Sequence, residues 1–119
     1  MDRQINTKAL FLAVCPRLNR GFTLTTQTWE EHIKPFHPLE DHHLPVIKQI
    51  IENCDEQQPV WYKSREPTRL CIVKQMPLFL PANKFLLIAL LIYSERTGCV
   101  TSVYPVDELP STKEGYKLL

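Results

Sequence analysis

The sequence predicts an α+β fold in which two N-terminal helices pack on an antiparallel sheet of four or more strands, with an N-terminal hairpin. Three observations predict it: short apolar segments bounded by turn residues, two intervening segments with helical spacing, and a long apolar run over residues 85–93. Strands and helices joined in this order by hairpin-length connections are typical of α+β proteins. At 119 residues the chain is expected to form one domain over 1–119, with a core of about 8–107. The tail over 108–119 is expected either to be loose or to dock through Tyr116, Leu118 and Leu119.

The first two strands are predicted to form a hairpin. Ala9–Cys15 is apolar and is followed by Pro16, and residues 22–25 alternate between apolar and polar. Residues 19–21 (Asn-Arg-Gly) predict the turn between them, with Gly21 free to adopt a positive φ.

Capping residues predict where the first helix begins. A helix is predicted over residues 27–34, ending before Pro35. Its cap is either Thr26, or Thr28 in a capping box with Glu31. A second helix is predicted over 44–53, where apolar residues recur at helical spacing. These residues are Leu44, Ile47, Ile50 and Ile51.

Four further strands are predicted after the helices. They cover Val60–Lys63, 69–73, 85–93 and 99–104. The run 85–93 is about half the length that spans a bilayer, so it predicts an interior strand packed on both faces.

Charge and cysteine content restrict the functional class. With 14 basic and 13 acidic residues the net charge is +1, so an RNA contact would need a local basic patch. The four cysteines form no C-x-x-C pair, which argues against a zinc ribbon or a redox motif. Reduced cysteines and a polar N-terminus without a signal sequence predict a cytoplasmic protein with no membrane contact.

Two segments carry groups suited to acid–base chemistry. Residues 29–38 place His32 and His37 near the end of the first helix, and residues 98–105 end a strand with Ser102 and Tyr104. Imidazole moves protons near neutral pH without a metal or a cofactor, and hydroxyl groups can hold a phosphate or a sugar. If the two segments meet, they form a metal-free catalytic site.

The order and spacing of these residues resemble the barnase/EndoU/colicin/RelE-like nuclease group, in its phage- and toxin-associated branches. The matching residues are Trp29, His32, Ile33, His37 and Pro38, with Glu40 one place late, then Gly98, Val100, Ser102, Tyr104, Pro105 and Asp107. The resemblance implies a metal-independent endoribonuclease in which the 2′-hydroxyl attacks the adjacent phosphate. It also implies RNA as partner, either tRNA or mRNA, and a neutralising partner protein in a toxin-like system.

On this interpretation His32, His37, Ser102 and Tyr104 are the expected catalytic residues, and no cofactor or metal is expected. The candidate phosphate-binding cations are Lys63, Arg65, Arg69, Lys74 and Lys84. Arg69 and Lys84 are preferred as substrate-binding residues because they lie at the starts of predicted strands.

Two other interpretations stay open. A non-catalytic protein-interaction module on the same scaffold is favoured by the near-neutral charge. In that case His32 packs where helix and sheet meet. A metal-dependent enzyme would use a histidine- and carboxylate-rich segment instead. Its candidate ligands are His37, Glu40, Asp41, His42 and His43.

Overall fold

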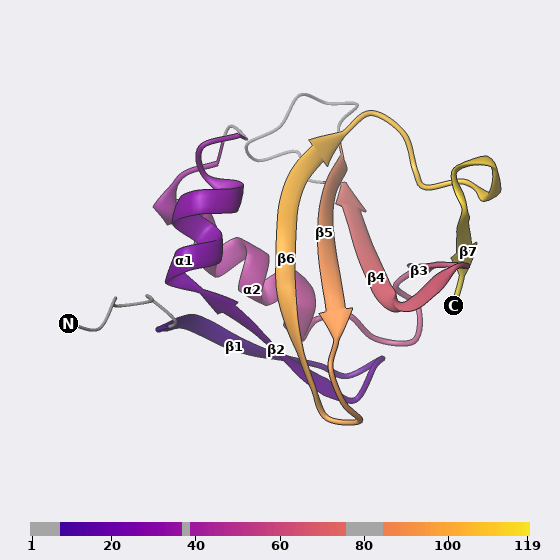
Figure 1. Cartoon of the computed structure of the whole chain (residues 1–119), viewed down its shortest axis with the longest axis horizontal. Helices are drawn as coiled ribbons and strands as arrows, with labels where there is room; N and C mark the ends of the chain where they lie inside the picture. Colours follow the sequence, from indigo (N-terminus) through magenta and orange to yellow (C-terminus); the bar gives the residue numbers. More distant parts are fainter. Residues whose placement is uncertain (1–7, 37–38, 76–84) are drawn as a thin grey trace.

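A computed structural model describes residues 8–36, 39–75 and 85–119. The fold is α+β, with a seven-stranded mixed sheet and two short helical regions (Figure 1). In chain order the elements are β1 (Ala9–Cys15), β2 (Arg20–Thr25), α1 (Thr26–Thr28), η1 (Trp29–Ile33), η2 (Asp41–His43), α2 (Leu44–Glu52), β3 (Val60–Lys63), β4 (Glu66–Gln75), β5 (Phe85–Ile92), β6 (Thr97–Val106), η3 (Thr112–Glu114) and β7 (Tyr116–Leu118).

The strand order in the sheet is β1-β2-β6-β5-β4-β3-β7. The long apolar run forms β5, which pairs antiparallel with β4 on one side and β6 on the other, so the predicted interior strand is confirmed. The sheet is not wholly antiparallel, because β2 and β6 run in the same direction. A parallel pair needs a long crossover connection, and here the helices and β3 to β5 supply it.

The N-terminal hairpin is confirmed, but its turn differs from the prediction. β1 and β2 pair antiparallel, with Cys15 opposite Arg20. Asn19 has the positive φ, 51°, whereas Gly21 does not. Asparagine tolerates this left-handed conformation better than most residues, so the turn does not need Gly21 there.

The first helical region has about the predicted position and length but is less regular than the predicted helix. α1 is a single α-helical turn, and η1 continues it as a π-helical turn. The cap is Thr25, whose hydroxyl accepts a hydrogen bond from the Thr28 amide at 3.2 Å. Trp29 and Ile33 are four residues apart and both are buried against the sheet.

The second helical region begins with η2 and continues as α2. Glu40 and His43 form a capping box, in which the Glu40 amide donates to Nδ1 of His43 at 2.9 Å. The predicted apolar face is confirmed, since Ile47, Ile50 and Ile51 are buried.

Alternation along the central strands creates two separate apolar clusters. Leu86, Ile88 and Leu90 of β5 join the main core under the helices, whereas Leu87 points the other way. We call the side of the sheet away from α1, η1 and α2 the open face. Its cluster consists of Trp61, Cys71, Val73 and Leu87. In Figure 1 the helices lie on one side of β5 and β6, and β7 lies on the other side of the molecule.

The C-terminal tail is part of the sheet. Tyr116–Leu118 pairs with β3 as an edge strand, and Tyr116 packs against the open-face cluster. Within the described ranges, no helix has the length and apolar character needed to cross a membrane.

Candidate functional site

The sheet separates His32 from Ser102. His32 is an exposed residue of η1, and its neighbours Trp29 and Ile33 are buried on the helix side of the sheet. Val103 of β6 belongs to the same core, so the adjacent Ser102 points to the open face. The expected meeting of His32 with the Ser102 hydroxyl is therefore not found.

Two other predicted site residues lie outside the described residues. They are His37, expected to be catalytic, and Lys84, expected to bind substrate.

Ser102 and Tyr104 lie on one side of β6. Ser102 is opposite Ala89 and Tyr104 is opposite Leu87, which belongs to the open-face cluster. In a regular strand Thr101 would point to the opposite side, but a β-bulge places it beside the same pocket. Its hydroxyl donates to the Ala89 carbonyl at 3.3 Å.

These side chains line a pocket of about 140 Å³ on the open face. The polar residues lining it are Lys63, Arg69, Thr101, Ser102, Tyr104 and Tyr116, with the Cys71 thiol beside them. We call this the open-face pocket. It brings together three sequence-predicted residues, Arg69, Ser102 and Tyr104.

The two cations of the pocket have different surroundings. The Arg69 Nε donates to a Glu66 carboxylate oxygen at 2.7 Å, and both side chains are substantially exposed. The Lys63 ammonium lies 5.7 Å from the centroid of the Tyr116 ring, within cation–π range. Arg69 is therefore oriented by an ion pair, and Lys63 by an aromatic ring.

Burial keeps the acidic groups of the pocket protonated. Burial raises the pKa of the Cys71 thiol to about 11, and the nearby Lys63 charge opposes that shift. The pKa values of Tyr104 and Tyr116 are also raised, chiefly by burial and secondarily by electrostatic interaction with neighbouring acidic groups that include Glu114. At neutral pH both phenols are therefore hydrogen-bond donors rather than phenolates.

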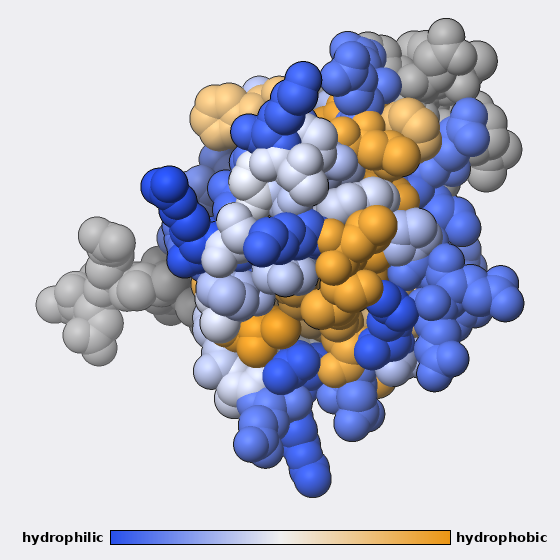
Figure 2. All heavy atoms as spheres, turned by 90° about the vertical axis from the view of Figure 1, so that its right-hand side faces the viewer, coloured by the Kyte–Doolittle hydropathy of each residue, from blue (hydrophilic) through white to orange (hydrophobic). Residues whose placement is uncertain are grey.

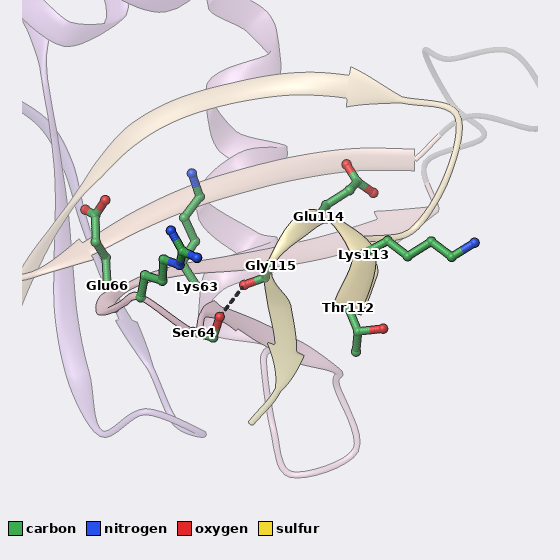
Figure 3. Close-up of a pocket in the computed structure, with 8 residues that line it drawn as sticks. Lys63, Ser64, Glu66, Thr112, Lys113, Glu114 and Gly115 are labelled. Atoms are coloured by element: carbon green, nitrogen blue, oxygen red, sulfur yellow. Dashed lines mark hydrogen bonds between the residues drawn. The ribbon is translucent and has the colours of Figure 1, made fainter.

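An open groove of about 530 Å³ adjoins the pocket, and Lys63 lines both. Its other lining residues are Ser64, Arg65, Glu66, Thr112, Lys113, Glu114 and Gly115. In Figure 3 the Ser64 hydroxyl points to the Gly115 carbonyl, to which it donates at 3.2 Å, while Lys113 points away. Lys63 extends across the strands next to β3 (Figure 3). It is the residue that connects the groove with the pocket.

The same side of the molecule carries exposed apolar residues. Figure 2 shows this side, where hydrophobic atoms form a stripe between hydrophilic ones. Leu118 and Leu119 are exposed there, at the end of β7. A ligand on this surface would meet apolar atoms as well as charges.

His37 lies outside the described residues, and the other candidate metal ligands, Glu40 to His43, make hydrogen bonds and ion-pair contacts within the helical regions. Asp41 accepts hydrogen bonds from the Trp29 indole at 2.8 Å and from the Lys34 ammonium at 3.0 Å. His43 is buried and caps its own helix, and the His42 ring lies 3.3 Å from a Glu40 oxygen. Across the part of the chain that the structure describes, no three His, Cys, Asp or Glu residues are grouped to hold a metal ion.

Sequence reasoning missed two of the residues that form the pocket. Lys63 was one of five candidate cations and was not preferred, and Tyr116 lay in a tail that was expected either to be loose or to dock, without a role in a site. Lys63 lies two residues after Trp61 in β3, and no local pattern in the sequence shows that β7 pairs with this strand.

Comparisons with protein-family models, curated proteins and solved structures find no match to this chain. The nuclease resemblance therefore rests on the sequence motifs alone.

Proposed function

We propose that this protein is a metal-independent endoribonuclease that binds single-stranded RNA at the open-face pocket. One observation carries the proposal: Lys63, Arg69, Ser102 and two tyrosines line the same small pocket. Ammonium and guanidinium groups bind phosphate, and aromatic rings stack on unpaired bases. This set of groups suits a nucleotide better than a purely apolar or purely anionic ligand.

The proposed reaction begins with attack of the ribose 2′-hydroxyl on the adjacent phosphorus. The bond from phosphorus to the 5′-oxygen breaks, leaving a 2′,3′-cyclic phosphate and a 5′-hydroxyl. Lys63 and Arg69 donate to the phosphorane oxygens, where negative charge accumulates. A protonated phenol, that of Tyr104, gives its proton to the leaving oxygen.

The base in this scheme is the Glu114 carboxylate, which takes the proton of the 2′-hydroxyl. Its charge acts on both Tyr104 and Tyr116, and it lines the groove next to Lys63. His32 has no part in the scheme because it lies on the other side of the sheet. In a toxin-like setting the RNA would be a tRNA or an mRNA, and a neutralising partner protein would protect the producing cell.

The test is incubation of the protein with total RNA, with and without a chelator, followed by analysis of the cleaved ends. We expect 2′,3′-cyclic phosphates under both conditions. Lys63→Ala, Arg69→Gln and Tyr104→Phe should each reduce cleavage about 10²-fold or more, the usual effect of losing one transition-state donor. The matched controls are Lys117→Ala and Tyr93→Phe, because neither residue lines the pocket or the groove. Controls as impaired as the pocket variants would contradict the proposal.

A second candidate function is a non-catalytic interaction module, favoured by the net charge of +1. RNA left intact at high protein concentration would favour this function over the nuclease. If RNA binding persists and depends on Lys63, the pocket is a binding site without catalysis. If binding is also absent, the open-face pocket has no RNA function.

A further inference from the structure

Within the part of the chain that the structure describes, β1 is a long edge strand with one unpaired side. It is the first strand of the sheet, and among residues 8–36, 39–75 and 85–119 only β2 pairs with it. The opposite edge, β7, has only three residues and includes Lys117. A short strand with a charge is a common protection against unwanted strand pairing, and β1 lacks both features.

The side chains of β1 are apolar on both faces. Phe11, Ala13 and Cys15 are buried under the helices. Leu12 and Val14 point to the open face, where they are 58% and 56% exposed. No charged residue or proline occurs within Ala9–Cys15, so neither side chains nor ring geometry block a further strand.

We propose that β1 pairs with β1 of a second copy of this chain, in antiparallel orientation, and so extends the sheet across a two-fold axis. The register of β1 is regular over residues 11–15, since the irregularity lies between Ala9 and Phe11. A two-fold axis at Ala13 pairs this regular stretch with itself. Such a self-complementary contact is the usual form of a dimer interface.

This register matches side chains on both faces. On the open face Leu12 lies opposite Val14 of the partner subunit, and the reverse pair forms across the axis. On the helix side Phe11 lies opposite Cys15 of the partner subunit. Every cross-strand pair is apolar, and such pairs stabilise neighbouring strands. A second copy is therefore a better occupant than a charged peptide, for which β1 offers no opposite charge.

The oligomeric state of the full chain tests the proposal. Sedimentation velocity from about 1 µM to about 1 mM covers the range expected for a contact of one strand. We expect the wild-type protein to dimerise with increasing concentration, and Leu12→Lys or Val14→Lys to stay monomeric. Leu118→Lys is the matched control, because Leu118 is 62% exposed on the other edge strand. Circular dichroism would check that each variant is folded.

A monomeric wild-type protein over the whole range would overturn the proposal, as would dimers that survive both β1 variants or that are lost in the control. A disulfide assay tests the register. Leu12→Cys mixed with Val14→Cys should cross-link faster under mild oxidation than either variant alone. Faster cross-linking of Leu12→Cys with itself would move the axis and contradict the register. The result is independent of RNA cleavage.

Discussion

Gly98 lies where the N-terminal hairpin joins the rest of the sheet. It is opposite Phe22 of β2 in the parallel pair and opposite Ile92 of β5. A methyl group added at Gly98 would lie 2.6 Å from the Leu91 carbonyl oxygen and 2.6 Å from a ring carbon of Phe22. Both neighbours are constrained, because one is backbone and the Phe22 ring is fully buried.

We therefore expect Gly98→Ala to destabilise the protein strongly. Overpacking a core by one methyl group usually costs about 1–3 kcal/mol. Two contacts about 1 Å closer than ordinary van der Waals distances place this variant at the upper end, about 3 kcal/mol. For a chain of this length, that corresponds to a melting temperature lower by about 10 °C.

The other two glycines provide controls for this reasoning. A methyl group at Gly21 would meet only the tip of the Leu12 side chain, at 3.0 Å, and that side chain can rotate into solvent. Gly115 has φ +87° with nothing near a methyl group, so its substitution costs only backbone strain of about 1 kcal/mol. Urea unfolding followed by fluorescence of the two tryptophans would measure all three variants. If Gly98→Ala lost no more stability than Gly21→Ala, the packing argument would be wrong.

Three further predictions concern the core, acid stability and thiol reactivity. Ile88→Ala should cost about 3 kcal/mol in urea unfolding, because Ile88 is fully buried in the main core. The Trp29 hydrogen bond holds the pKa of Asp41 below its ordinary value, so the stabilisation is present above about pH 4 and lost as pH falls through the lower folded pKa. Asp41→Asn should therefore flatten the decline of stability below about pH 4, and an unchanged decline would contradict this. Iodoacetamide at pH 8 should alkylate the half-buried Cys99 before Cys71, because burial raises the pKa of the Cys71 thiol to about 11. Mass spectrometry of the alkylated native protein would measure the order, and modification of Cys71 first would contradict the prediction.

The elements with strong local patterns were predictable. The run that forms β5 is apolar without interruption because the main core packs on one side of it and Leu87 contacts the open-face cluster on the other. The spacing of Ile47, Ile50 and Ile51 likewise defines the buried side of α2. In both elements the spacing of apolar residues follows from the surfaces that the element packs against, so the sequence alone predicts the element and its buried side.

The sheet topology depends on contacts that no local pattern records. The parallel direction of β2 and β6 follows from the crossover that connects them, not from either strand's residues. β7 has three residues, of which Lys117 is charged, so its alternation is too short to distinguish from a loop. Tyr116 could not be assigned to a site before the position of β7 was known.

The position of the candidate site depends on one bulge. In a regular strand Val100 and Ser102 would share a face, and a buried Val100 would place Ser102 and Tyr104 in the main core. The bulge at Thr101 shifts the alternation, so that Val100 and Val103 both enter the core while Ser102 and Tyr104 point to the open face. Bulges redirect side chains in this way next to functional sites in many sheets. His32 belongs to η1, which packs on the helix side of the sheet, so the same bulge that turns Ser102 and Tyr104 toward the pocket also separates them from that histidine.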